Sequence, residues 1–363
     1  MKTKSNSATA GSSNNASPQL TMPIETLEVT PLAASISPTA PTAVDARPTI
    51  SLSEHPVCSK RYVITTPQVE ALCSEAVNLV ENRSPGAVFW APPRTGKTRA
   101  LDILQIEFAE VFPGMPVMLL PAWDYTTPRE GPFMEDLLKA AGHAIVKRGR
   151  PEDKRERLVE LMADFAIQNG EGRIVLIVDE AQQLHEKHYK WLMGIHNLLA
   201  MYGVHMITLL VGQHQLVHQR TAFLRAEKEN IVGRFMVQMF QFHGIQDQKE
   251  LEESLTAYDV EEYPLGSGWS YTRFFAPELF VSGWRLAMVA PLLWGAFYEA
   301  RQLAPADKAP KEIQMQYFCR TVEYILQKLH GVDVANVEAM RKLMKTAIAA
   351  SRYLDVLMVD MES

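Results

Sequence analysis

The chain has 363 residues, of which 47% are hydrophobic and 21% are charged, and its formal net charge is −6. This length and composition are enough for one large or two medium globular domains with a buried core. The acidic balance excludes a general electrostatic attraction to nucleic acid, so a DNA contact would need a local basic patch. Cys58, Cys73 and Cys319 lack the spacing of a disulfide framework or a zinc site and are typical of reduced thiols.

Neither a signal peptide nor a membrane helix is expected. Polar Ser, Asn and Gly residues follow the basic start at residues 1–4, where a signal peptide needs an apolar core. The most apolar late stretch, residues 286–297, is far shorter than the roughly 20 residues of a membrane helix. We therefore expect a cytoplasmic protein that does not bind membranes.

The N-terminal segment, residues 1–55, is predicted to be a disordered tail. It is rich in Ser, Thr, Ala and Pro, and the first Phe, Trp or Tyr of the chain is Tyr62. Such a segment cannot bury enough apolar surface to offset the entropy of ordering. A solvated leader is the simpler interpretation, and a partner-binding arm is the alternative.

Residues 56–245 alternate between short apolar runs and longer amphipathic stretches. The apolar runs predict strands at residues 87–90, 116–120, 174–178, 206–211 and 235–242. Helical patterns lie at residues 67–82, 98–111, 130–141, 156–169 and 192–202, the first with Thr66 as N-cap and Pro67 at its first position. This alternation predicts an α/β fold with a three-layer αβα arrangement and a parallel sheet.

After residue 245 the β-branched runs disappear and amphipathic helical patterns dominate. They predict helices at residues 248–258, 285–301, 312–329 and 337–356. We divide this all-helical part into a lid, residues 246–305, and a C-terminal helical extension, residues 306–363.

A phosphate-binding loop is predicted between the first strand and the following helix. Its residues are Ala91, Pro92, Pro93, Arg94, Thr95, Gly96, Lys97 and Thr98, followed by Arg99. In such loops backbone N–H groups wrap the phosphates, a lysine reaches the β/γ oxygens and a hydroxyl binds Mg²⁺. Gly96, Lys97 and Thr98 fit these roles, whereas Ala91 replaces the usual first glycine. The loop therefore predicts ATP and Mg²⁺ as cofactors.

Two acidic residues, Asp179 and Glu180, follow the five apolar residues 174–178 directly. That run suits a central parallel strand, which places Asp179 at the carboxyl edge of the sheet, where ligands of such sheets bind. We assign Asp179 to Mg²⁺ and Glu180 to the base that polarises the attacking water. A solvated helix start is the alternative, which the phosphate loop upstream disfavours.

A basic cluster lies between the second and third strands. It consists of Lys147, Arg148, Arg150, Lys154, Arg155 and Arg157, offset by Glu152, Asp153 and Glu156. Such a stretch can follow a DNA backbone, and a solvated helix face is the alternative.

These motifs carry a family likeness. The chain resembles AAA+ ATPases that regulate transposition in Tn7-like and Tn5053-like elements, the TnsC/TniB group, and more distantly the ExeA-type secretion ATPases. The likeness covers about residues 60–300. The matching segments are APPRTGKT, IVLIVDEAQQL, LLVGQHQL, GRF before the last strand, FHGIQDQKELEESLTAYD and SGWRLAM. Trp284 departs from the pattern of the lid motif.

The resemblance implies roles for three further residues. Gln213, just past the fourth strand, takes the place of the polar sensor that orients the hydrolytic water, with Thr208 as a competitor inside the strand. Arg234, just before the fifth strand, takes the place of the arginine that reaches the γ-phosphate of a neighbouring subunit. Arg285 takes the place of a second sensor in the lid. Arg220 and Arg225 are alternatives to Arg234, and each arginine also fits an ordinary capping or solvated position.

The resemblance also implies a function. It implies an ATP-hydrolysing homo-oligomer, a ring or filament on double-stranded DNA in the bacterial cytoplasm, that links a target-selection protein to the transposase. Lys147, Arg148 and Arg150 would face the DNA, and hydrolysis would control disassembly. The alternatives are a nucleotide-stabilised scaffold with little turnover, an ExeA-like ATPase and a replication loader. Glu180 counts against the scaffold.

Overall fold

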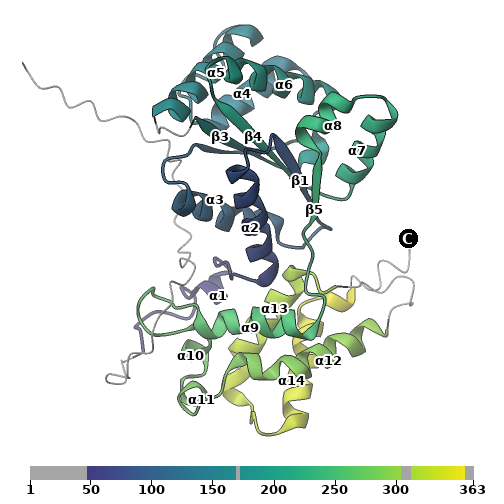
Figure 1. Ribbon diagram of the computed structural model, residues 1–363. Coiled ribbons are helices and arrows are strands. Elements are labelled where there is room, and N and C mark those ends of the chain that lie inside the picture. The colour runs from purple at the N-terminus through teal and green to yellow at the C-terminus, as the bar shows by residue number, and fades with distance from the viewer. Residues whose placement is uncertain (1–46, 169–171, 304–311, 356–363) are drawn as a thin grey trace, which may run out of the picture.

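The computed structural model describes residues 47–168, 172–303 and 312–355. They form an α/β domain and a helical region that lies beside it (Figure 1). Most of the predicted tail lies outside the described residues. Within the described ranges, no helix has both the length and the apolar character needed to cross a membrane.

A five-stranded parallel sheet in the order β2-β3-β4-β1-β5 forms the centre of the α/β domain. Its strands are β1 (Gly86–Trp90), β2 (Val117–Pro121), β3 (Arg173–Asp179), β4 (His205–Gly212) and β5 (Gln238–Gln241). The predicted parallel sheet is confirmed, and four predicted strands agree with the structure within one residue at each end. The fifth is shorter than predicted because Phe235 ends a helix, α8, instead of starting the strand.

Helices cover both faces of the sheet. They are α2 (Pro67–Glu81), α3 (Lys97–Val111), α4 (Glu130–Ala140), α5 (Pro151–Gln168), α6 (Glu186–Met201), α7 (Gln215–Arg225) and α8 (Glu229–Phe235). α2 and α3 pack on one face, and α4, α5 and α6 pack on the other (Figure 1). α7 and α8 were not predicted from the sequence, and α5 and α6 begin earlier than predicted, at Pro151 and Glu186. Thr66 is the N-cap of α2 as predicted, but its side chain makes no capping hydrogen bond.

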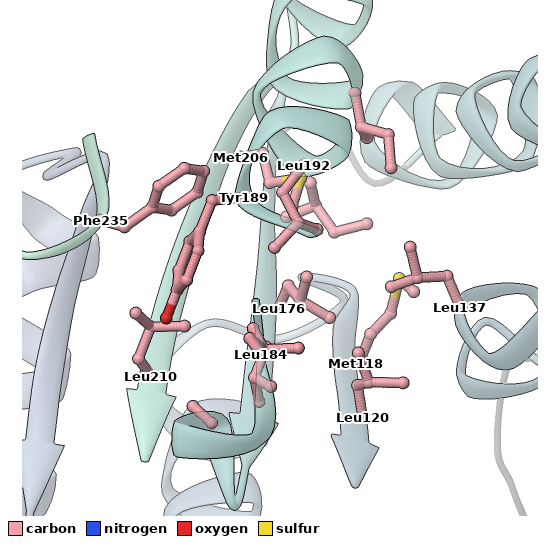
Figure 2. Close-up of a cluster of buried hydrophobic side chains, with 14 of the residues drawn as sticks. Met118, Leu120, Leu137, Leu176, Leu184, Tyr189, Leu192, Met206, Leu210 and Phe235 are labelled. Carbon is pink, nitrogen blue, oxygen red and sulfur yellow. The ribbon is translucent and has the colours of Figure 1, made fainter. Parts of the chain in front are cut away.

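The two faces of the central strand β3 fill different cores. Ile174, Leu176 and Val178 point into the core under α4, α5 and α6, where Leu176 lies among Met118, Leu184 and Leu192 (Figure 2). Val175 and Ile177 point into the core under α2 and α3. A strand buried on both faces needs apolar residues at every position, which explains the unbroken run in the sequence.

The helical region is built from α-helices and two short 3₁₀ segments. Among the described residues these are α1 (Pro56–Ser59), α9 (Gln248–Val260), α10 (Tyr271–Phe275), α11 (Pro277–Val281), α12 (Ala290–Arg301), α13 (Met315–Lys328) and α14 (Val337–Ala350), with η2 (Leu286–Val289) and η3 (Leu329–Gly331). The helix predicted from Arg285 begins as η2 and becomes α-helical only at Ala290.

One hydrophobic core unites this region across the predicted boundary between lid and extension. Val57 from α1, Leu255 from α9, Leu293 from α12 and Phe318 from α13 are all fully buried in the same cluster. The described chain thus passes first through the helical region, at α1, then through the α/β domain, and returns to the helical region after β5.

The return crossing is fixed by a short antiparallel bridge. Ile245 N donates to Ile313 O at 2.9 Å, and Ile313 N donates to Ile245 O at 2.8 Å. A Cβ on Gly244 would lie 2.3 Å from Ile313 O, so the two backbones can approach this closely only because residue 244 is glycine. The bridge holds the start of α13 close to the end of β5.

A buried carboxylate connects α9 to η2. Asp259 accepts hydrogen bonds from Leu286 N at 2.8 Å and Ala287 N at 3.0 Å. We expect Asp259→Ala to lower the free energy of unfolding by about 2–4 kcal/mol, because two N–H groups lose a charged acceptor in a buried setting. Urea unfolding monitored by circular dichroism measures this loss. Glu252→Ala, at an exposed position of the same helix, should change the free energy by less than about 0.5 kcal/mol.

Candidate functional site

The phosphate loop joins β1 to α3 and contains two residues with left-handed backbone conformation. Arg94 has φ 67° and Gly96 has φ 94°. The turn at Gly96 directs the chain into α3, which begins at Lys97. The N-terminal amides and the positive end of α3 therefore face the space above the loop, which is an arrangement suited to phosphate.

Lys97 lies under the loop. Its side chain is buried, and Nζ lies 3.1 Å from Pro92 O and 3.4 Å from Ala91 O. Burial lowers the pKa of this amine, and the carboxylates of Glu180 and Asp179 act in the opposite direction. The ammonium group is thus held within the loop, where it can turn from the carbonyls to phosphate oxygens.

Thr98 and Asp179 meet at the carboxyl edge of the sheet. Thr98 Oγ1 donates to Asp179 Oδ2 at 3.2 Å. Burial raises the pKa of Asp179, against a hydrogen bond from the Glu180 amide that lowers it. A hydroxyl and a carboxylate at this separation are hard oxygen ligands that fit Mg²⁺ together with phosphate and water. The structure therefore brings the two predicted metal ligands together.

Glu180 and Gln213 also meet. Gln213 Nε2 donates to Glu180 Oε2 at 3.2 Å. Gln182, which was not predicted as a site residue, donates from Nε2 to the same oxygen and accepts from Gln213 N at 3.1 Å. A Cβ on Gly212 would lie 2.3 Å from Gln182 Oε1, so the glycine at the end of β4 makes room for this network.

Thr208, the competitor for the sensor role, lies elsewhere. It is fully buried inside β4, and its Oγ1 lies 2.9 Å from His196 Nε2. Burial, with Arg234 and His205 adding to the effect, lowers the pKa of His196 to about 3, so a neutral imidazole pairs with this hydroxyl. Of the two candidates, only Gln213 contacts Glu180.

A cavity of about 500 Å³ opens beside the loop. Its walls come from the phosphate loop, from the segment that precedes α2, and from α13. Five cationic side chains line it, against two carboxylates: Lys60, Arg94, Lys97, Arg99 and Arg320, against Glu180 and Glu323. This size and positive balance suit a nucleoside polyphosphate. Of the residues predicted to bind nucleotide, Pro93, Thr95, Gly96 and Thr98 also line the cavity, whereas Ala91 and Pro92 do not. The carbonyl oxygens of Ala91 and Pro92 instead accept hydrogen bonds from Lys97 Nζ.

Arg285, the predicted lid sensor, is not among the residues that line the cavity. Its Nη1 donates to Phe280 O at 2.9 Å and Trp284 O at 2.8 Å, and its guanidinium lies 3.6 Å from the centroid of the Phe280 ring. An arginine of the helical region that does line the cavity is Arg320 on α13. No sequence signal pointed to Arg320, because α13 lies outside the segment that carried the family likeness.

Arg234 lies away from the cavity of its own chain. It occupies the last turn of α8, and its Nη1 donates to Asn197 Oδ1 at 2.8 Å. A Cβ built on Gly86 would lie 2.7 Å from the Arg234 carbonyl oxygen, so Arg234 lies at the amino end of β1. The phosphate loop follows the opposite, carboxyl end of that strand. Of the alternatives, Arg220 Nε donates to Met236 O at 2.9 Å, and Arg225 is exposed at the end of α7.

The structure divides the basic cluster into two groups. Three members have partners: Lys154 pairs with Glu135 at 2.6 Å, Arg155 pairs with Glu130 at 2.5 Å, and Arg157 donates to Ile145 O at 2.8 Å and Arg148 O at 3.2 Å. Lys147, Arg148 and Arg150 are exposed in the loop before α5, and none forms an ion pair with a described residue. These three were the residues predicted to face DNA.

The phosphate loop between β1 and α3, with an acidic pair at the end of β3, defines a P-loop protein. The strand order β2-β3-β4-β1-β5 and the helical region after the sheet give the AAA+ fold. Residues 82–219, which run from the end of α2 into α7, match the family described as "AAA domain". No curated protein matches the chain.

Several solved structures are similar to this chain. The Aeropyrum pernix ORC2 protein, in ADPNP-ADP complexes, is 13% identical with a TM-score of 0.42, over 85% of this chain and 99% of that one. Drosophila ORC bound to DNA is 14% identical with a TM-score of 0.49, over 77% and 70%. AMPPCP-bound DnaA from Aquifex aeolicus is 12% identical with a TM-score of 0.34, over 86% and 98%.

The positions of Arg320 and Arg285 lead to opposite expectations for nucleotide binding. Arg320→Ala should raise the dissociation constant for a slowly hydrolysed ATP analogue roughly threefold to tenfold, because a cation is removed from the wall of the cavity. Arg285→Ala is the matched control and should leave that constant within about twofold of wild type. Isothermal titration calorimetry measures both. If Arg285→Ala raised this dissociation constant more than Arg320→Ala, the sensor role would be assigned to Arg285, as the resemblance implies.

Proposed function

We propose that this protein is a Mg²⁺-dependent ATPase. The observation that carries the proposal is the convergence of Thr98 with Asp179, and of Glu180 with Gln213, at the sheet edge beside the phosphate loop. Loop amides and Lys97 would hold the β- and γ-phosphates, and Thr98 and Asp179 would hold Mg²⁺, which neutralises charge on the transferred phosphoryl group. Glu180 would accept a proton from the attacking water, and Gln213 would fix the orientation of that carboxylate.

We further propose that the ATPase forms a homo-oligomer on double-stranded DNA and regulates transposition, coupling a target-selection protein to the transposase. The transposition role rests on the motif resemblance. The DNA contact is supported by the exposed Lys147, Arg148 and Arg150. Arg234 would act on the nucleotide of a neighbouring subunit, because its position at the far end of the sheet keeps it from its own.

Two other functions share this fold. A nucleotide-stabilised scaffold would need the phosphate loop but no hydrolytic base, and the hydrogen bonds that position Glu180 favour turnover. A replication loader would bind nucleotide and DNA in the same way but would act on a helicase, not on a transposase. Transposition assays with the cognate transposase would distinguish a replication loader from a transposition regulator.

Electron microscopy with double-stranded DNA tests assembly. We expect rings or filaments with ATP or a slowly hydrolysed analogue and fewer with ADP. Glu180→Gln should cut turnover by at least about 100-fold, because the general base is removed, while the assemblies persist in ATP. Lys97→Ala should abolish both nucleotide binding and assembly. A nucleotide-bound monomer that does not bind DNA would refute the oligomer proposal. The ATPase proposal would still be tested separately, by the turnover measurement.

Fluorescence anisotropy with duplex DNA tests the basic loop. The triple variant Lys147→Ala, Arg148→Ala, Arg150→Ala should weaken binding at all DNA sequences. It should also reduce the slope of log K against log salt by about 0.9 for each phosphate that the loop neutralises in wild type. The charge-matched control is Lys328→Ala, Arg341→Ala, Lys342→Ala, which removes three exposed cations from α13 and α14. Equal effects in the two triple variants would mean that net charge, not the loop, governs binding.

A further inference from the structure

The first turn of α13 rests directly on the phosphate loop. Gln316 N donates to Arg94 O at 3.2 Å, and Arg94 Nη1 donates to the hydroxyl of Tyr317. The Met315 side chain lies 3.5 Å from the position that a Cβ on Gly96 would occupy. Gln316 and Tyr317 of the helical region thus contact Arg94, and Met315 lies close to Gly96.

Arg94 has a backbone conformation that needs support from other residues. Its φ of 67° places a residue with a full side chain in the left-handed region, which costs about 1–2 kcal/mol relative to an ordinary conformation. Both its carbonyl oxygen and its guanidinium are held by α13, within two successive residues. The conformation of the loop at this point therefore depends on a partner outside the α/β domain.

Tyr317 is a rigid support. The residue is 2% exposed, and its ring lies 5.6 Å from the ring of Tyr353, centroid to centroid. Both residues belong to the single core of the helical region. The hydroxyl of Tyr317 thus lies at the edge of that core, and the packing of α13 sets its position.

The contact leaves room for a ligand. The cavity beside the loop has a volume of about 500 Å³ with α13 in place, and Gln316 and Arg320 line it together with Gly96 and Thr98. This volume lies within the range of small-molecule sites. A polyphosphate can therefore bind while Tyr317 and Arg94 remain in contact.

We propose that Tyr317 is a positioning residue for phosphate binding, which it supports through Arg94. Docking of α13 on the loop holds Arg94 in the conformation that presents the loop amides, so a bound phosphate and the docked α13 stabilise each other. The coupling is reciprocal, because a contact that raises phosphate affinity is strengthened by phosphate to the same degree. This inference rests on the proposed nucleotide binding and adds to it a residue from outside the loop.

A double-mutant cycle tests the inference. Arg94→Ala, Tyr317→Phe and the double variant are titrated with a slowly hydrolysed ATP analogue and with inorganic tripolyphosphate. Tyr317→Phe keeps the buried ring and removes only the hydroxyl. Each single variant should bind both probes roughly threefold to tenfold more weakly, and the double variant should bind no more weakly than the weaker single variant. Hydrogen exchange at residues 315–318 should slow when the analogue binds wild type, and should slow less in Tyr317→Phe.

The control is Tyr324→Phe, because Tyr324 lies on the same helix and packs against the core of the helical region. It should leave both affinities and the exchange response at the wild-type values. Single variants that bind like wild type would overturn the inference, and so would effects that multiply in the double variant. Failure of wild type itself to bind either probe would instead refute the proposed nucleotide binding.

Discussion

The parallel pairing of β3, β4 and β1 is the constraint on which the rest of the site depends. Parallel strands in register end at one edge of the sheet, so residues from distant parts of the chain converge there. Asp179 ends β3, Gln213 follows β4, and the phosphate loop follows β1. The Thr98–Asp179 and Glu180–Gln213 contacts follow from this register, and a slip of one residue in any pair would separate them.

Most of the sheet and the sheet-edge residues could be predicted from the sequence, because their signals are local. The unbroken apolar run at residues 174–178 requires a strand buried on both faces, and the glycine-lysine loop requires a strand before it and a helix after it. The end of each run also fixes which polar residue stands at the edge. That is why Asp179 and Gln213 could be placed without a structure.

The helical side of the cavity could not be predicted in the same way. Whether Arg285 or Arg320 lines the cavity depends on how the helices pack. Arg285 stands at the start of one helical segment and Arg320 lies within another, and no local pattern distinguishes the two. In the structure, the Phe280 ring and two carbonyls hold Arg285, and the bridge between Ile245 and Ile313 brings α13 to the loop. The division of the basic cluster likewise depends on tertiary partners, since Glu130 and Glu135 come from another helix.

The single core of the helical region has a mechanical consequence. The chain passes between the two parts of the molecule once near Thr66 and once near Gly244, and Thr66 itself lines the cavity. A rotation about the line that joins these two connections would open and close the two parts about one axis. Arg94 and Tyr317 meet across the boundary between the two parts, so such a rotation changes their separation directly. The phosphate loop is thus in a position to sense the angle between the two parts of the molecule.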